Sequence, residues 1–227
     1  MTPPESTQQE QLKEKDVLII DYDIGNLLSI TNALDFLGYT YIISNKVSDI
    51  IAAKAYILPG VGAFNEAMQN LNNLQIIPTL TQEVVIKKKP LLGICLGMQI
   101  LAQSSTENGN HQGLGWIPGK VIKIPQAGNL KVPQVGWNTL TITIKDPLFS
   151  RVPDSPHFYF DHSYHFLSDA EFIAATCQYG STITAAVRKE NIFGVQFHPE
   201  KSQNNGLKMY RSFFNYIKQT TLEQNTP

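Results

Sequence analysis

The chain has 227 residues, of which 42% are hydrophobic and 10% aromatic, which is enough apolar material for the core of one α/β domain. Its 18 basic and 19 acidic residues leave a net charge of −1, so it lacks the strongly basic character that nucleic acids or anionic membranes attract. No apolar run approaches the ~18 residues that a membrane-spanning helix needs, and the polar N-terminus lacks the apolar core of a signal peptide. We therefore expect a cytoplasmic protein that binds neither nucleic acid nor membrane.

The first half of the chain alternates strand-like and helix-like segments. Residues 1–15 are polar and predict a disordered leader, followed by a single domain over 16–219 and a flexible tail over 220–227. A helix is expected over 25–38, because apolar residues recur at helical spacing and Gly38 can end it. A helical pair is expected across 63–88. Apolar, β-branched runs predict buried strands within 16–22, 41–44, 55–60 and 89–97.

The second half is dominated by strand-like runs without long helices between them. Residues 181–197 predict a hairpin that turns at 189–191. A closing helix is expected over 206–219, with Leu207, Tyr210, Phe214 and Ile217 on one face. Other strands are expected at 121–125, 139–144, 157–164 and 172–176. The pattern predicts an α/β fold with a mostly parallel central sheet flanked by helices and extended by antiparallel strands.

A candidate nucleophile, Cys95, lies at a strand-to-helix junction between Gly93 and Gly97. Glycines two residues on either side leave room for the tight turn that lifts a nucleophile clear of a sheet. A helix beginning near Gly97 would direct its positive end at the sulfur, and the backbone N–H of Leu96 would point to a developing oxyanion. The alternative is a buried structural cysteine, which is the interpretation we give to Cys177 because it has no such flanks.

A candidate base, His198, ends a predicted strand, with Glu200 two residues later and Pro199 stiffening the link. A carboxylate in this position can hold the far imidazole nitrogen and fix the tautomer of the ring. The alternative is a surface or capping histidine. The five histidines and two cysteines show no metal-ligand spacing, so we expect no metal and no cofactor.

The motifs G-x-C-x-G-x-Q around Cys95 and H-P-E at 198–200 resemble those of the class I (triad) glutamine amidotransferases, which have a flavodoxin-like fold. The resemblance extends over about residues 16–217 and is similar in detail to the glutaminase subunits of imidazole glycerol phosphate synthase. The further matching segments are 21–22, 25–27, Ser29, 59–64, 113–115, Pro133, 136–138, 159–160, 162–164 and 196–202.

The resemblance implies a role for each matching residue. Cys95 would attack the side-chain carbonyl of L-glutamine, His198 would transfer the proton and Glu200 would orient His198. Val61 and Gly62 would form the oxyanion strand together with the N–H of Leu96. The residues implied to contact the glutamine are Gly60, Gln99, Ser163 and Tyr164. Without the resemblance, residues 59–62 would be an ordinary strand-end turn and Gln99 a helix-surface residue.

The resemblance also implies a partner, a (β/α)₈-barrel cyclase that forms a heterodimer with the chain and receives the ammonia for histidine biosynthesis. Trp137 and Asn138 would lie at this interface, although a core position for Trp137 is the alternative. Two departures from the family pattern are Asp23 in place of a glycine and Asp161 in Tyr159-Phe160-Asp161-His162-Ser163. They keep open a related ammonia donor for bacterial surface-sugar amination or amidination. A catalytically inactive amidotransferase-like scaffold is a third hypothesis.

Overall fold

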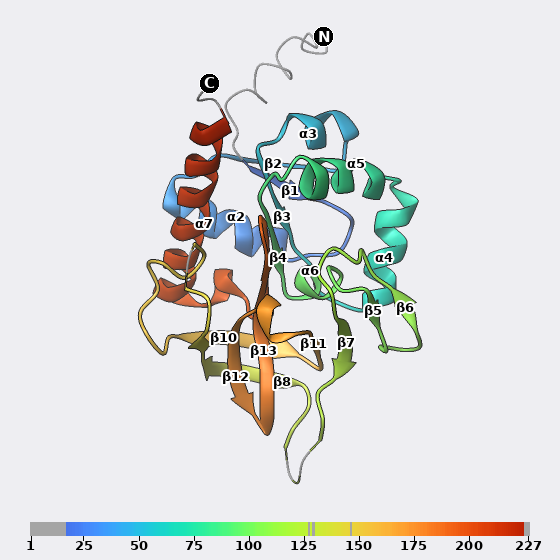
Figure 1. Ribbon diagram of the computed structural model, residues 1–227, viewed down its shortest axis with the longest axis vertical. Coiled ribbons are helices and arrows are strands. Elements are labelled where there is room, and N and C mark those ends of the chain that lie inside the picture. The colour runs from blue at the N-terminus through green and yellow to red at the C-terminus, as the bar shows by residue number, and fades with distance from the viewer. Residues whose placement is uncertain (1–16, 127, 129, 146, 225–227) are drawn as a thin grey trace.

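The computed structural model describes residues 17–224, except 127, 129 and 146. An eight-stranded sheet with the order β2-β1-β3-β4-β14-β13-β12-β9 runs through the protein, and helices cover both faces of its first half (Figure 1). This first half is parallel, so the predicted α/β fold is confirmed. Its strands are β1 (Val17–Ile20), β2 (Tyr41–Ser44), β3 (Ala55–Leu58), β4 (Leu91–Ile94) and β14 (Ile192–Val195).

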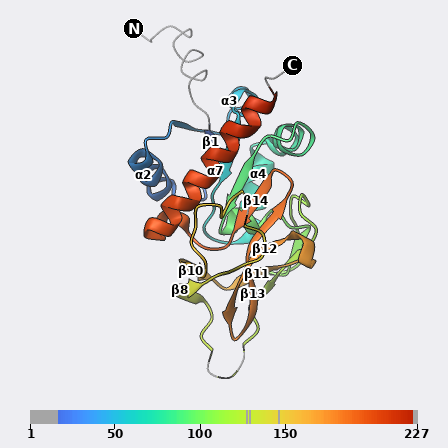
Figure 2. The same ribbon diagram turned by 60° about the vertical axis from the view of Figure 1, so that its left-hand side comes forward.

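The parallel strands are apolar on both faces because each face has its own core. Val17 and Ile19 of β1 point to one core, and Leu18 and Ile20 point to the other. Alternate side chains of a strand face opposite sides of a sheet, so a continuous apolar run fits a doubly covered sheet. One face is covered by α2 (Leu27–Leu37) and α7 (Gln203–Gln224), and the other by α3 (Val47–Ala52), α4 (Phe64–Asn73) and α5 (Ile77–Thr81) (Figures 1 and 2).

The predicted helices match the structure closely where a cap is present. In α2, the Asn26 side chain accepts a hydrogen bond from the Ser29 N–H at 3.3 Å, and Gly38 ends the helix with a φ of 72°. The expected pair across 63–88 is α4 and α5, and a π-helical turn, η1 (Gln82–Ile86), follows α5. The short α3 was not predicted, because six residues carry too little periodicity.

The closing helix is longer than the sequence pattern indicates. It runs from Gln203 to Gln224, so residues 220–224, where the sequence predicts a flexible tail, continue the helix. Tyr210, Phe214 and Ile217 are buried as predicted, and Leu207 packs against the same core. The expected leader at 1–15 and residues 225–227 lie outside the described residues.

The second half extends the sheet with antiparallel strands and adds two small sheets. The predicted hairpin is confirmed as β13 (Ser181–Lys189) paired with β14, and β12 (Ile173–Tyr179) and β9 (Thr141–Ile142) complete the large sheet. The expected strand at 157–164 is two strands, because the chain leaves one sheet and joins another at Ser163. The small sheets contain β10 (His157–His162) with β8 (Gln134–Thr139), and β11 (Tyr164–Leu167) with β7 (Lys120–Lys123), β5 (Ser104–Ser105) and β6 (His111–Gln112).

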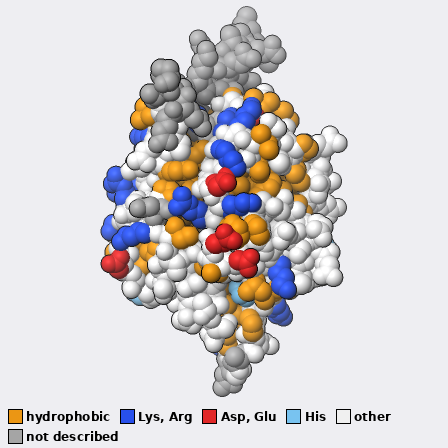
Figure 3. Space-filling view, viewed as in Figure 1, with side chains coloured by type: hydrophobic (Ala, Val, Ile, Leu, Met, Phe, Trp, Pro, Cys, Tyr) orange, Lys and Arg blue, Asp and Glu red, His pale blue; other side chains and the backbone are white. Residues whose placement is uncertain are grey.

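Charged side chains of both signs are interspersed over the face drawn in Figure 3, in keeping with the balanced composition. Within the described residues, no helix combines the length and apolar character needed to cross a membrane.

Candidate active site

The predicted site residues come from the carboxyl ends of neighbouring parallel strands. Cys95 directly follows β4, and His198 follows β14, which pairs with β4 in parallel. Gly60 and Tyr22 follow β3 and β1 at the same edge of the sheet. Open α/β sheets bind ligands at this edge, where the loops after adjacent strands converge. The topology therefore brings Cys95 and His198 together although 103 residues separate them in the chain.

Cys95 occupies a strained turn, as expected for a nucleophile elbow. Its backbone has φ 55° and ψ −110°, a conformation that residues other than glycine rarely adopt. Both flanking glycines are required by close packing. A Cβ on Gly97 would lie 1.8 Å from the Leu58 carbonyl oxygen, and one on Gly93 would lie 2.7 Å from the Gly97 carbonyl oxygen.

The helix after Cys95 is shorter than expected. α6 contains only Leu96–Gln99, one helical turn, so it does not supply the dipole of a long helix. The Leu96 N–H, expected to face an oxyanion, donates a 3.3 Å hydrogen bond to the carbonyl oxygen of Gly60. In this conformation the amide is therefore occupied by the chain itself.

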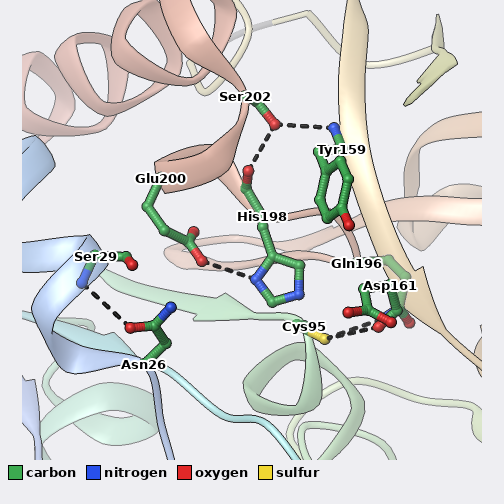
Figure 4. A network of polar contacts seen from close by, with 9 residues as sticks. All are labelled: Asn26, Ser29, Cys95, Tyr159, Asp161, Gln196, His198, Glu200 and Ser202. Atoms are coloured by element: carbon green, nitrogen blue, oxygen red, sulfur yellow. Dashed lines mark hydrogen bonds and ion pairs between the residues drawn. The ribbon is translucent and has the colours of Figure 1, made fainter. Parts of the chain in front are cut away.

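His198 and Glu200 form a buried pair. The Nδ1 atom of His198 lies 2.8 Å from Oε1 of Glu200, and the two side chains are 4% and 1% exposed. Glu200 belongs to the 3₁₀ turn η3 (Pro199–Lys201), which brings it back against the ring of His198. Figure 4 shows Glu200, His198 and Cys95 following one another in that order. The backbone of His198 is held by Tyr159, whose carbonyl accepts the His198 N–H at 2.9 Å.

The surroundings of His198 favour its charged form. Burial lowers the pKa of His198, but hydrogen bonds to Cys95 and Glu200 outweigh burial and raise the pKa to about 10. An imidazolium beside a cysteine stabilises a thiolate, the reactive form of sulfur. The three side chains can therefore hold a thiolate–imidazolium pair with the carboxylate as the orienting group.

The sulfur faces a cavity of about 300 Å³. Most of the predicted glutamine-contacting and oxyanion residues lie in its wall. Gly60 does not line the cavity, but its carbonyl oxygen accepts the hydrogen bond from the Leu96 N–H. The lining residues are Val61, Gly62, Cys95, Leu96, Gln99, Glu107, Pro133, Asp161, His162, Ser163, Tyr164, His198 and Lys201.

Gln99 is not a helix-surface residue. It is 5% exposed, and its Nε2 donates to the carbonyl oxygen of Tyr164 and to Oε1 of Gln196, both at 3.0 Å. With its donors used inside the protein, Gln99 can meet a ligand only through its Oε1 acceptor.

Glu107, Gln196 and Tyr22 also belong to the site, although the sequence patterns predict no role for them. Glu107 is half-buried in the cavity wall and is held by the Phe64 N–H at 2.8 Å. Gln196 is fully buried and its Nε2 lies 3.7 Å from the Cys95 sulfur. Tyr22 is 1% exposed and donates its hydroxyl proton to the Pro59 carbonyl. Tyr22 and Gln196 stand in motifs that were recognised, but Glu107 gives no signal in a single sequence.

Trp137 and Asn138 lie on β8, away from the cavity wall. Trp137 is 49% exposed, so the alternative of a core aromatic is wrong, and its ring packs edge-on against Tyr159 with centroids 6.1 Å apart. Asn138 donates to the Gln178 carbonyl oxygen at 2.9 Å. The neighbouring Val135 is 57% exposed, which makes this strand an apolar surface next to the site.

The two departures from the family pattern have different surroundings. Asp23 has a φ of 65°, a left-handed conformation that glycine adopts freely and aspartate tolerates. Asp161 is exposed at the cavity mouth, and its carbonyl oxygen is 4.0 Å from the Cys95 sulfur.

Cys177 is buried in the core, where desolvation raises its pKa to about 11. Among the described residues, no three His, Cys, Asp or Glu side chains gather as metal ligands do.

Comparison with known proteins agrees with this geometry. Residues 18–217 match the family described as glutamine amidotransferase class-I. The chain is 49% identical over 203 residues to the imidazole glycerol phosphate synthase subunit HisH 2 of Vibrio vulnificus, covering 89% of this chain and 95% of that protein. It is 46% identical over 197 residues to the subunit HisH of Lacticaseibacillus casei, covering 87% and 94%, and 40% identical over 202 residues to HisH 2 of Pseudomonas aeruginosa, covering 88% and 100%.

Solved structures share the fold at lower sequence identity. A glutamine amidotransferase structure covers 88% of this chain and 98% of its own, with a TM-score of 0.69 and 19% identity. A structure of PurLQS from Thermotoga maritima covers 90% and 99%, also with a TM-score of 0.69, at 18% identity.

Proposed function

Because the chain belongs to the class I glutamine amidotransferase family, we propose that it hydrolyses L-glutamine to glutamate and ammonia as the glutaminase subunit of imidazole glycerol phosphate synthase. The observation that carries the proposal is the position of the Cys95 sulfur, which faces the cavity beside the buried His198–Glu200 pair. The identities of 40% to 49% to HisH subunits, over nearly their whole lengths, support the assignment to this synthase.

The reaction follows from the three side chains. The Cys95 thiolate attacks the side-chain amide carbon of glutamine, forming a C–S bond and a tetrahedral oxyanion. His198 gives its proton to the amide nitrogen, the C–N bond breaks and ammonia leaves, so a γ-glutamyl thioester remains. His198 then takes a proton from water, whose oxygen attacks the thioester and releases glutamate and the thiolate. Glu200 keeps the ring oriented in both steps through its 2.8 Å contact with Nδ1.

The oxyanion needs backbone donors, for which we propose Leu96 together with Val61 and Gly62. In the conformation described, the Leu96 N–H donates to Gly60, and Gly62 has a φ of 111°, which only glycine adopts readily. Rotation of the peptides after Gly60 would free the Leu96 amide and turn another N–H toward the cavity. We therefore interpret the structure as a resting state with low glutaminase activity.

The amino-acid end of glutamine carries a carboxylate and an ammonium group. Glu107 provides a half-buried carboxylate in the cavity wall for the ammonium group, and Oε1 of Gln99 provides a further acceptor. Ser163 and Tyr164, at the junction of β10 and β11, line the cavity near Gln99 and are proposed to contact the carboxylate end.

We propose that a (β/α)₈-barrel cyclase docks over Trp137 and Asn138 and receives the ammonia, forming imidazole glycerol phosphate in the cytoplasm. The exposed Trp137 ring, together with Val135 on the same strand, supports this placement. Aromatic residues at the centre of an interface often contribute most of the binding energy.

The test is a glutaminase assay of the chain alone, with the cyclase, and with the cyclase and its nucleotide substrate. Slow turnover alone and strong stimulation by the full mixture are expected. Brisk turnover of the isolated chain would contradict the resting-state interpretation and the coupled-subunit proposal.

A second candidate function is supply of ammonia to the amination or amidination of a surface sugar. The relatives in Vibrio vulnificus and Pseudomonas aeruginosa are named HisH 2, and the one in Campylobacter jejuni is named HisH 1. In this chain, Asp23 and Asp161 depart from the usual pattern. Growth of a histidine auxotroph lacking its own glutaminase subunit would support the histidine pathway, and failure of an expressed, folded chain would favour the second candidate. Labelling of Cys95 by an electrophilic glutamine mimic would exclude an inactive scaffold, and absence of labelling, even with the partner present, would favour it.

A further inference from the structure

The Cys95 sulfur has a polar neighbour to which the reaction above gives no role. Gln196 directly follows β14 and is 0% exposed, and its Nε2 lies 3.7 Å from the sulfur. Figure 4 shows Gln196 beside the sulfur together with Asp161, whereas His198 approaches from Glu200. The nucleophile is therefore contacted by an imidazole and by a buried amide from the same chain segment.

The amide of Gln196 can point only one way. Its Oε1 accepts a hydrogen bond from Nε2 of Gln99 at 3.0 Å, so its NH₂ group must face the sulfur. Gln99 is itself fixed, because the same Nε2 donates to the Tyr164 carbonyl at 3.0 Å. The orientation of the donor toward Cys95 is thus determined by neighbours rather than by free rotation.

The backbone holds donor and acceptor in register. The N–H of Cys95 donates to the Val195 carbonyl at 2.8 Å, and the N–H of Gln196 donates to the Ala185 carbonyl at 2.9 Å. These bonds place the two side chains at the ends of paired parallel strands. Neither residue can move away from the other without breaking the sheet.

An amide at this position is costly unless its hydrogen bonds are needed. Gln196 is 0% exposed, so its amide has no water to bond with, and an apolar side chain of similar size would avoid the cost of burying it. A thiolate accepts an N–H bond much more strongly than a neutral thiol does, because one partner is charged. The buried donor therefore matches an anionic sulfur.

We propose that Gln196 is a further catalytic residue, whose amide N–H stabilises and orients the Cys95 thiolate, and that Gln99 is a positioning residue acting through Gln196. The proposal rests on the proposed function in taking Cys95 as the nucleophile. It also adds to the expected role of Gln99, whose Nε2 is used to hold Gln196 and Tyr164.

A matched control exists in the same molecule. Gln134 is also buried, at 2% exposure, and its Nε2 lies 3.9 Å from the sulfur of Cys177, which lies outside the cavity. Gln134→Met therefore removes an amide–sulfur contact of the same kind and leaves the Cys95–Gln196 pair in place, although it also removes the Oε1 contact with Nε2 of His162 at 3.0 Å.

The experiment measures alkylation of Cys95 by iodoacetamide between pH 5 and 10 in the full-length chain, with the modified peptide identified by mass spectrometry. The variants are Gln196→Met, which removes the donor, Gln196→Glu, which replaces the donor with a negatively charged acceptor of the same shape, Gln99→Met and Gln134→Met. Thermal unfolding identifies any variant that does not fold. The other ionisable groups that face the sulfur or line its cavity are His198, Tyr22, Asp161, His162, Glu107, Tyr164 and Lys201, and no variant replaces any of them.

Loss of the donor is expected to move the alkylation midpoint to higher pH and to slow alkylation at pH 7 at least about tenfold, the size expected for one hydrogen bond to a charged sulfur. Gln196→Glu should raise the alkylation midpoint at least as far. Gln99→Met should raise it by a smaller amount, and Gln134→Met should leave it unchanged. An unchanged or lower midpoint in a folded Gln196 variant would overturn the proposal, as would an equal shift in Gln134→Met. If Gln196→Met does not fold, Gln196→Leu, which removes the donor without adding a charge, takes its place.

Alkylation needs neither glutamine nor a partner, so failure of the proposed function is recognised separately. A wild-type chain that does not hydrolyse glutamine with any partner would contradict the proposed function, while the alkylation midpoints would still decide the role of Gln196.

Discussion

The amide of Leu96 donates a 3.3 Å hydrogen bond to the carbonyl oxygen of Gly60, linking the turn after β4 to the turn after β3. The same turn is held from behind by Tyr22, whose buried hydroxyl donates to the Pro59 carbonyl. The Pro59 carbonyl is thus anchored, while Val61 and Gly62 are exposed at the cavity. A change of conformation that frees the Leu96 amide would therefore be confined to the peptides after Gly60.

Alanine at Gly60 and at Gly62 is expected to have different effects. A Cβ on Gly60 would lie 2.6 Å from the Tyr22 hydroxyl and 2.9 Å from Cβ of Leu96, so Gly60→Ala should destabilise the fold by about 1–3 kcal/mol and abolish turnover. A Cβ on Gly62 meets nothing closer than 3.8 Å, but the φ of 111° strains it. Gly62→Ala should therefore disfavour the resting conformation and raise partner-free turnover several-fold. Thermal unfolding and glutaminase assays check both, and equal losses in the two variants would contradict this interpretation.

The two cysteines are expected to differ sharply in function. Cys95→Ala should lower turnover by at least ~10³-fold, because the covalent step is lost. Cys177→Ala is the matched control, since Cys177 is buried in the core and lines no part of the cavity. We expect it to keep turnover within a factor of two and to cost about 1 kcal/mol of stability. Turnover that survives in Cys95→Ala would remove Cys95 as the nucleophile.

The His198–Glu200 pair predicts a dependence of stability on pH. Burial lowers the pKa of His198, but its bonds to Cys95 and Glu200 raise it to about 10, above its ordinary value of 6.5. His198 binds a proton more tightly in the folded chain than in the unfolded chain. The resulting stabilisation of the fold is complete below about pH 6.5 and is lost as the pH rises through 10. Urea unfolding should show Glu200→Gln less stable than wild type by about 3 kcal/mol at pH 6, with the gap narrowing toward pH 10. A gap that is constant over this range would show that the pair does not hold the proton.

Much of the fold could be predicted because the first half carries long, consistent signals. Each parallel strand is a short apolar run, and Asn26 and Gly38 mark the ends of α2. The strand β8 was missed because Gln134–Thr139 includes a glycine at φ 130° and alternates only weakly in polarity. The break at Ser163 was missed because a change of partner strand leaves no mark in the local pattern.

The site could be predicted only where its chemistry lies within a short motif. Cys95 with its glycines and His198 with Glu200 are local patterns, and the fold brings the two motifs together. The contacts of Gln196 with Cys95 and of Glu107 with Phe64 span 101 and 43 residues. Those contacts depend on which loops meet at the end of the sheet, and that is decided by topology rather than by local sequence.

Trp137 is expected to contribute strongly to binding of the barrel partner. Trp137→Ala should weaken the heterodimer by about 30-fold or more, because a half-exposed tryptophan beside a second aromatic ring is typical of an interface hot spot. The matched control is Leu167→Ala, since Leu167 is similarly exposed, at 43%, but lies on β11 of a different sheet. Titration calorimetry with the cyclase measures both. Equal affinities for the two variants would place the interface elsewhere.

His162 is expected to set the acid limit of stability. Burial lowers its pKa to about 4, although the bond between Nδ1 and the Tyr164 carbonyl at 2.7 Å opposes the shift. The neutral ring is favoured in the folded chain, so the unfolded chain binds more protons between pH 6.5 and 4, and stability falls as the pH falls through that range. The glutamine of His162→Gln cannot take up a proton, so this variant should lose less stability than wild type when the pH falls from 7 to 4.5. Loss of the His162 contacts lowers its stability at both pH values. Because burial also lowers the pKa of His165, a His165→Gln variant separates the two contributions. Urea unfolding at both pH values measures the difference, and an identical acid loss in wild type and His162→Gln would show that His162 is not the residue responsible.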